Sequence, residues 1–396
     1  MSETFAEFCR DGNVRSYACG SKSGRGMKRL LSAAVVALMV RGCCSLAGDP
    51  SRVTRGLTKD RVLAESSVTH DVTERGDTLL SYRFRGDSAH AERLQELVTR
   101  AMSSPAGASI LSEMARNDCV VMMEPIGLST AGFYAPGLNL ICLNSLMSDA
   151  TLLSTMIHEG KHASQAYATQ YQISDPSYDR ASLITLGRAM EADAMSAQAA
   201  FSYELKERGD SEAWRELRSS HRGITDAFEA SAVKYGADSH EARQAATLAW
   251  YDDKSYVRLY ENQYASALKN TLQAVSPEQL ALMATRSIPA DSIVSQICRM
   301  DGVSYFGKDG SVLETPETYY IRSGTLSKLE EVDKKFREKT GKVLGKERSD
   351  SSHLTFYVVP AIGSVRKPAL RRGKDGAVTT VAVRAARQDV SRGRGL

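Results

Sequence analysis

The sequence has no hydrophobic run long enough to cross a bilayer. Its longest candidate, residues 30–40, is only eleven residues, whereas a membrane-spanning helix needs about 20. The chain also has no C-x-x-C pair, no internal repeat and no glycine-rich loop of the kind that cradles phosphate. These absences argue against a cysteine-based structural zinc site, a repeat protein and a P-loop enzyme.

Cysteine is scarce outside the N-terminus. Four of the seven cysteines fall within residues 1–44, which leaves Cys119, Cys142 and Cys298. An odd count gives no complete disulfide framework. We therefore expect Cys119 and Cys142 to be small buried hydrophobic residues.

Positive charge is scarce in the middle of the chain. The formal net charge of +4 arises at the ends, which leaves −7 for residues 45–364. We therefore expect no nucleic-acid partner for the folded part. Residues 365–396 carry nine Lys and Arg against two acids and are predicted to be a flexible basic tail. The alternative is electrostatic attachment of this tail to an anionic surface such as a membrane.

The most informative motif that is present lies in residues 157–163, which read Ile-His-Glu-Gly-Lys-His-Ala and contain H-E-x-x-H. Residues four apart lie on one helix face with Cβ atoms about 5–6 Å apart, so His158 and His162 can bind one metal ion. Zn²⁺ suits neutral imidazole, and Glu159 then lies where it can take a proton from a metal-bound water. The motif predicts hydrolytic chemistry with Zn²⁺ as the cofactor.

A third ligand is expected from the helix predicted over residues 181–208. Glu191 follows His162 by 29 residues, enough for one helix to end and a second to return to the metal. Asp193 and Glu204 on the same helix are rival ligands. Upstream, residues 131–143 read as two β runs joined at Pro136-Gly137, and an exposed strand edge there can hold an extended peptide.

The order hairpin, H-E-x-x-H helix and glutamate-bearing helix resembles the zincin metallopeptidases of the gluzincin type, and it is similar to uncharacterised bacterial metallopeptidases. The resemblance covers about residues 119–208. It implies a zinc-dependent peptidase acting on a peptide or protein substrate, and the alternative is a zincin-like binding protein without turnover. The roles that it implies are zinc ligation by His158, His162 and Glu191, general base catalysis by Glu159, and substrate alignment by Gly132, Phe133, Tyr134 and Ala135.

The sequence departs from the thermolysin-like pattern in one place. That pattern has an Asp four residues after the ligand Glu, where this chain has Met195. Asp193 is expected to point to a different face, so the group that orients the zinc histidines is unassigned. Stabilisation of the oxyanion is also unassigned. The candidates are Tyr178, Tyr203, His221, Tyr235, Tyr251 and Tyr256.

The N-terminus has the layout of an export signal. Lys28 and Arg29 precede the apolar residues 30–40, and Gly42-Cys43 resembles a bacterial lipoprotein cleavage site. We expect export to the cell envelope with lipid attachment at Cys43, and with translation starting at Met27 or with a long n-region. The alternative is a cytoplasmic protein in which this segment is a short apolar helix.

The overall pattern predicts an α+β fold: a small mixed β-sheet lobe with an edge-strand hairpin, followed by a mostly helical lobe, with the metal at their junction. The predicted divisions are a leader over residues 1–44, a zincin-like domain over 45–330, a linker with one strand over 331–364, and the tail. In the helical lobe, single helices are predicted over residues 211–235 and 239–270.

Overall fold

The computed structural model describes residues 54–341, except residues 73–78, 128–129, 174, 176, 275, 277–279, 281–282 and 284, and it also describes residues 357–359. The predicted leader over residues 1–44, with Cys43, and the predicted basic tail over residues 365–396 lie outside the described residues.

One lobe is built on a five-stranded mixed sheet in the order β1-β2-β3-β5-β4. Its strands are β1 (Ser67–Val72), β2 (Leu79–Arg85), β3 (Val120–Glu124), β4 (Gly132–Ala135) and β5 (Leu140–Asn144). β3 pairs in parallel with β2 and with β5, whereas β1 pairs antiparallel with β2, and β4 pairs antiparallel with β5. The predicted hairpin is therefore present, and β4 forms one edge of the sheet.

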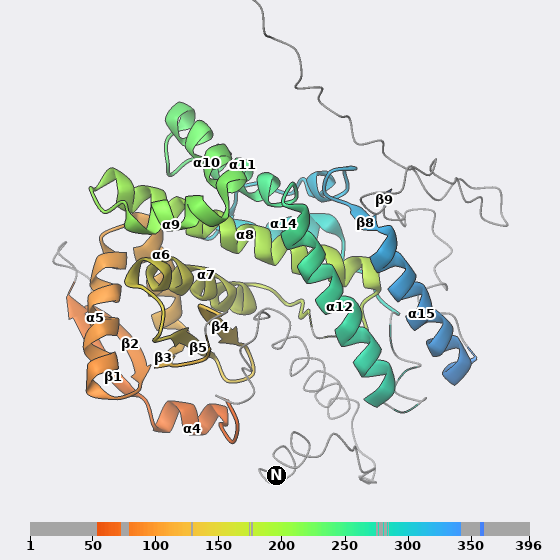
Figure 1. Ribbon diagram of the computed structural model, residues 1–396, viewed down its shortest axis with the longest axis horizontal. Coiled ribbons are helices and arrows are strands. Elements are labelled where there is room, and N and C mark those ends of the chain that lie inside the picture. Colours follow the sequence, from red (N-terminus) through yellow and green to blue (C-terminus); the bar gives the residue numbers. More distant parts are fainter. Residues whose placement is uncertain are drawn as a thin grey trace, which may run out of the picture.

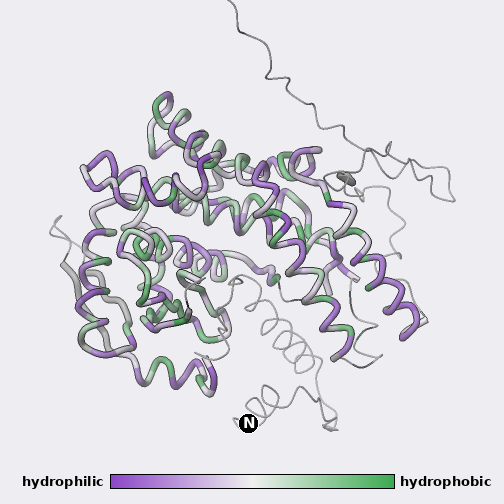
Figure 2. Tube along the Cα trace, viewed as in Figure 1, coloured by the Kyte–Doolittle hydropathy of each residue, from purple (hydrophilic) through white to green (hydrophobic). Residues whose placement is uncertain are grey.

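Both faces of β3 and β5 are buried, which is why these strands read as unbroken apolar runs. Because successive side chains point to opposite faces, Val121 and Ile141 join one hydrophobic cluster, while Met122 and Cys142 join another. Figure 2 shows this gathering of hydrophobic residues around the strands. The helices of this lobe are α4 (Lys59–Ala64), α5 (Ser88–Met102), α6 (Pro105–Arg116) and α7 (Asp149–Ala168).

The second lobe is helical and is organised around α8 (Arg180–Glu207), which crosses the middle of the molecule next to α7 (Figure 1). Most residues of α8 are buried on all sides, so it forms the core of this lobe. The surrounding helices are α9 (Glu212–Ser220), α10 (Arg222–Tyr235), α11 (His240–Trp250), α12 (Lys254–Ala274), α14 (Ala290–Gln296) and α15 (Ser323–Thr340). Together the lobes confirm the predicted α+β class.

Two helices that were predicted as continuous are each divided in the structure. The helix expected over residues 211–235 breaks at His221, whose backbone is not helical. The helix expected over residues 239–270 breaks after Trp250, and α12 then begins with the Asp253 side chain accepting the N–H groups of Ser255 and Tyr256. Such capping starts a new helix in a new direction, which apolar periodicity alone did not reveal.

The C-terminal part also differs from the prediction. Residues 331–340, expected to belong to a linker, are the second half of α15, which ends at Gly341 with a left-handed φ of 68°. Two further short pairings are β6 (Arg299–Met300) with β7 (Val303–Ser304), and β8 (Tyr320–Arg322) with β9 (Tyr357–Val359). β9 falls within the strand expected in residues 331–364, and β8 is its partner.

The cysteine prediction is confirmed. Cys119, Cys142 and Cys298 are buried free thiols, and burial raises the pKa of Cys119 to about 12. Within the described residues, no helix combines the length and apolarity needed to cross a membrane.

Gly160 lets helices α6 and α7 approach each other closely. A Cβ at this position would lie 2.6 Å from Met114 Sδ and 2.8 Å from Ile110 Cγ2, both on α6. Real Cβ atoms essentially never come this close. The glycine therefore sets how tightly the H-E-x-x-H helix packs on its neighbour.

We predict that Gly160→Ala destabilises the fold by about 1 kcal/mol. Alanine gains about 1 kcal/mol of helix propensity, but overpacking costs typically 1–3 kcal/mol. The matched control is Gly223→Ala in α10, where a Cβ meets nothing within 4 Å, so that variant should be neutral or more stable. Urea unfolding of both variants checks this, and equal stabilisation by both substitutions would contradict it.

Candidate metal centre

His158 and His162 occupy one face of α7, and their Nε2 atoms lie 3.2 Å apart. Glu191 reaches them from α8. Its Oε2 lies 3.5 Å from His158 Nε2, and its Oε1 lies 3.5 Å from His162 Nε2. The three side chains offer one ligand atom each, all within 4.8 Å of one another. The structure therefore brings together the three residues that the sequence analysis named as ligands.

The rival ligands on α8 do not join this group. Glu204 Oε2 accepts hydrogen bonds from the Ser104 hydroxyl and the Ala106 N–H at the start of α6. Asp193 accepts from the Tyr305 hydroxyl and from the Gln165 amide instead. Glu191 is thus the carboxylate of α8 that faces both imidazoles.

The electrostatics of the group favour a positive charge at its centre. Burial disfavours the charged form of His162, but the adjacent Glu191 carboxylate outweighs burial and raises the pKa of His162 to about 9. Burial alone would raise the pKa of Glu191, yet the facing His162 holds it well below its usual value. Glu191 Oε2 is buried and accepts no hydrogen bond. Two imidazole nitrogens and a carboxylate converging in this way fit a divalent metal cation.

Two glutamines orient the histidines, and neither was predicted. His158 Nδ1 lies 3.2 Å from Gln198 Oε1, and His162 Nδ1 lies 2.9 Å from Gln165 Oε1. An amide oxygen only accepts hydrogen bonds, so each Nδ1 carries a proton, and in the neutral imidazole each Nε2 then has the lone pair. This is the tautomer that a metal ligand needs.

Asp193 contacts the metal group indirectly, through Gln165. The Gln165 amide nitrogen donates to Asp193 Oδ2 at 2.7 Å and to the Met190 carbonyl at 3.0 Å, which fixes which end of the amide faces His162. Helical spacing in the sequence could have pointed to both glutamines as neighbours of the metal group. Gln165 lies three residues after His162, and Gln198 lies seven after Glu191, each on its ligand's face.

Glu159 faces the edge of the sheet. Its Oε2 accepts a hydrogen bond of 2.9 Å from the Tyr134 N–H of β4. The Ala131 carbonyl accepts from the Asn144 N–H, so alternate residues, Gly132 and Tyr134, direct their backbone groups away from β5. All of Gly132–Ala135 is buried, and the Tyr134 N–H holds Glu159 in place.

Of the six candidate oxyanion donors, His221 and Tyr256 lie near the metal group. Burial and then the charge of His158 lower the pKa of His221, against the opposing Asp253. Burial and then the charge of Glu191 raise the pKa of Tyr256. The two rings pack edge to face with centroids 5.0 Å apart. The other candidates are in the helical core (Tyr178, Tyr203 and Tyr251) or half exposed at the end of α10 (Tyr235).

Comparison with known proteins gives one match. Residues 73–306, more than half of the chain, match the model of a family described as "Putative metallopeptidase family (DUF6782)". This segment includes the whole sheet from β2 onward, α7, α8 and α12. No curated protein and no solved structure matches the chain.

We predict that the purified protein holds about one metal ion per chain and that His162→Ala and Glu191→Ala lose it. Each substitution removes one of three converging ligand atoms. The matched control is His90→Ala, a histidine on α5 whose neighbour is Asp87. Metal content is measured by inductively coupled plasma mass spectrometry, and retention of metal by both ligand variants would refute the site.

We predict that Gln198→Ala weakens metal binding by about 10–100-fold, the usual effect of removing a group that orients a ligand histidine. Gln198→Glu keeps an acceptor for His158 Nδ1 and should recover most of the affinity. Competition with a chromophoric chelator gives the dissociation constants. Equal affinities for wild type and Gln198→Ala would show that the amide does not orient His158.

Proposed function

Because the chain belongs to this metallopeptidase family, we propose that it is a zinc-dependent peptidase whose reaction takes place at His158, His162, Glu191 and Glu159. The observation that carries the proposal is the convergence of three ligand atoms within 4.8 Å. The Glu159 carboxylate is near enough to act on the pKa of His162, and the Tyr134 N–H of the edge strand holds it. Two imidazoles and a carboxylate are a ligand set that catalytic zinc uses.

His158, His162 and Glu191 would hold the metal. When bound, zinc supplies a water whose pKa is lowered to about 7 and polarises the carbonyl that is attacked. The protein supplies the remaining groups. The Gln198 and Gln165 oxygens keep the two Nδ1 atoms protonated, so both Nε2 atoms stay available as ligands.

Glu159 is the proposed general base. Its Oε2 is engaged by the Tyr134 N–H, which fixes the carboxylate and leaves Oε1 to accept a proton from the attacking water. The same oxygen then delivers that proton to the leaving amine as a general acid.

His221 and Tyr256 are the proposed donors to the developing oxyanion. They come from the start of α10 and from α12, and their pKa values respond to His158 and Glu191 respectively. His221 Nδ1 is buried without a hydrogen-bond partner, with Asp253 Oδ2 4.0 Å away. One such donor is typically worth about 10²–10³ in kcat.

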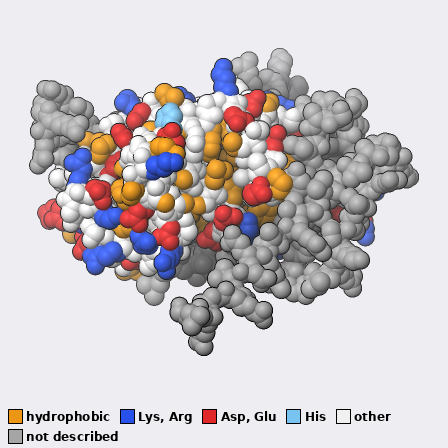
Figure 3. Space-filling view, turned by 90° about the horizontal axis from the view of Figure 1, so that it is seen from above, with side chains coloured by type: hydrophobic (Ala, Val, Ile, Leu, Met, Phe, Trp, Pro, Cys, Tyr) orange, Lys and Arg blue, Asp and Glu red, His pale blue; other side chains and the backbone are white. Residues whose placement is uncertain are grey.

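The proposed substrate is a peptide or protein whose backbone runs alongside β4. Gly132, Phe133, Tyr134 and Ala135 are the residues proposed to align it, and the Tyr134 N–H in this strand is bonded to Glu159. On the face drawn in Figure 3, Lys and Arg side chains are interspersed with Asp and Glu. A mixed surface of this kind supports a peptide substrate rather than nucleic acid.

Export with lipid attachment at Cys43 remains part of the proposal, with a cytoplasmic location as its alternative. Attachment of the basic tail to a membrane surface likewise remains a proposal. The sequence features that support them are the charged and apolar segment before Cys43 and the nine Lys and Arg of residues 365–396.

We predict that Glu159→Gln retains its metal but loses about 10²–10⁴-fold in turnover, the usual contribution of a general base. Cleavage of a defined peptide library, followed by mass spectrometry, gives the rates. Glu96→Gln on the exposed side of α5 is the matched control and should cleave like wild type.

A metal-loaded Glu159→Gln protein that cleaves as fast as wild type would exclude this mechanism. A metal-loaded wild type that cleaves no peptide in the library would instead favour the metal-holding binding protein without turnover.

A further inference from the structure

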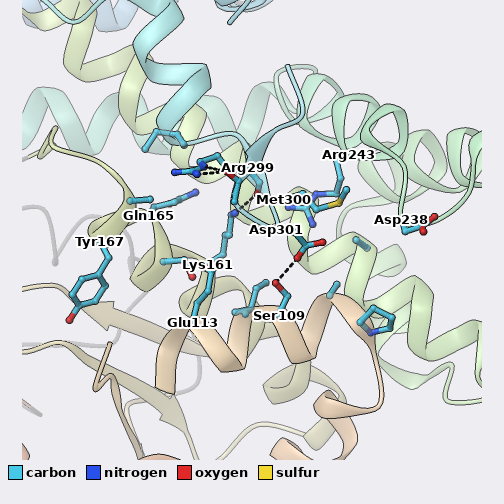
Figure 4. A pocket seen from close by; sticks show the side chains of 18 of the residues that line it. Ser109, Glu113, Lys161, Gln165, Tyr167, Asp238, Arg243, Arg299, Met300 and Asp301 are labelled. Carbon is cyan, nitrogen blue, oxygen red and sulfur yellow. Dashed lines mark hydrogen bonds between the residues drawn. The ribbon is translucent and has the colours of Figure 1, made fainter. Parts of the chain in front are cut away.

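A cavity of about 300 Å³ lies beside the metal centre, on the neighbouring face of α7. Figure 4 shows Lys161, Gln165 and Arg243 among the side chains that surround it. The residues that line this cavity include neither Glu159 nor any of the three candidate metal ligands. It is therefore separate from the proposed reaction site, and Gln165 stands between the two.

Arg243 of α11 is the cavity residue that most needs a ligand. It is only 3% exposed, and its Nε is buried without a hydrogen-bond partner. Its nearest carboxylate oxygen is Asp193 Oδ1, 3.6 Å from Nη2, and its guanidinium lies 5.7 Å from the Tyr305 ring centroid. No hydrogen bond joins this guanidinium to another described residue, although it has five N–H donors.

Asp193 does not accept a hydrogen bond from Arg243, because its nearest oxygen lies 3.6 Å from Nη2, and both of its oxygens have other partners. Oδ1 accepts from the Tyr305 hydroxyl at 2.9 Å, and Oδ2 accepts from Gln165 at 2.7 Å and lies 3.3 Å from Lys161 Nζ. A buried charge without hydrogen bonds is costly. A ligand carboxylate would meet the planar fork of Arg243 with two parallel hydrogen bonds.

A negative group close to Arg243 also lines the cavity. Glu204 is 9% exposed, and its two hydrogen bonds, from Ser104 and Ala106, both go to Oε2. Oε1 is left to accept from a ligand. Burial raises the pKa of Glu204, and the nearby Arg243 acts in the opposite direction. One end of the cavity thus pairs an unsatisfied guanidinium with a carboxylate, which suits a ligand carrying both charges.

The rest of the lining combines charged side chains, among them Glu113, Lys161 and Asp301, with apolar ones. Ile110, Ala200, Ile297 and Met300 contribute apolar surface. About 300 Å³ is at the small end of ligand cavities. We propose that this cavity binds a free apolar α-amino acid, whose carboxylate pairs with Arg243 and whose ammonium pairs with Glu204. The site goes beyond peptide hydrolysis and stands whether or not the chain cleaves peptides.

The test is isothermal titration calorimetry on the full-length, metal-loaded protein with three probes of matched shape. They are L-leucine, 4-methylpentanoate, which lacks the ammonium, and 3-methylbutylamine, which lacks the carboxylate. We expect saturable binding of L-leucine at one site. Each analogue should bind at least about tenfold more weakly, because it leaves one charged side chain without its partner.

Two variants locate the binding. Arg243→Gln removes the carboxylate partner and should abolish L-leucine binding. Ser164→Leu points a larger side chain into the cavity from α7 and loses only the bond from its hydroxyl to the Gly160 carbonyl. The matched control is Ser266→Leu, which breaks the same kind of bond, to the Asn262 carbonyl, on an exposed face of α12. It should bind L-leucine like wild type.

Circular dichroism establishes that each variant is folded, and Ser164→Leu decides alone if Arg243→Gln does not fold. Three results would overturn the proposal. They are no saturable binding of L-leucine to wild type, undiminished binding to folded Ser164→Leu, and binding of either analogue as tight as that of L-leucine.

Discussion

Helix α7 is buried on almost every side, and the rest of the molecule is arranged to satisfy the polar groups that it carries inside. His158, Lys161, His162, Ser164 and Gln165 are all below 10% exposed. A buried polar group without a partner costs about 1–3 kcal/mol, so each must find one within the fold. The partners come from α8, from the segment around Arg299 and from α7 itself. The position of α8 against α7 is therefore specified by polar groups as much as by apolar packing.

Asp193 shows how this constraint spreads. It is completely buried, where an ionised carboxylate is tolerated only with cations and donors around it. Lys161, Gln165, Tyr305 and Arg243 surround it. The same carboxylate thus orients the amide that holds His162 and leaves Arg243 short of an acceptor. One buried carboxylate thus contributes both to the candidate metal centre, through Gln165, and to the neighbouring cavity, through Arg243.

Helical spacing and chain length predicted part of the candidate ligand group, but they left Asp193 and Glu204 as rivals of Glu191, and the packing of α8 on α7 is what brings Glu191 to the two imidazoles. His158 and His162 are four apart, and Glu191 is at a distance that lets a second helix return. Gln165 and Gln198 were missed because glutamine is also an ordinary helix former, and only the packing of α7 on α8 shows that their amides meet imidazoles. His221 and Tyr256 could not be selected from the six candidates in the sequence, because they reach the metal group only through the helix breaks at His221 and before Asp253. Those breaks depend on local backbone and capping geometry that apolar periodicity does not show.

The position of Glu159 depends on a contact between two elements that are close in sequence. Gly132 has no side chain, and a Cβ there would lie 2.8 Å from Thr155 Cγ2 of α7 and 2.9 Å from the Cys142 carbonyl oxygen. Only glycine lets the helix approach the edge strand so closely. Thr155 lies one turn before Glu159, so this approach is also what brings the Glu159 carboxylate to the Tyr134 N–H. On the opposite side, Gly160 permits the equally close approach of α6. The H-E-x-x-H helix thus packs closely against a neighbour at Gly132 on one side and at Gly160 on the other. These two contacts fix the rotation of the helix about its axis and hence the directions in which His158, Glu159 and His162 point.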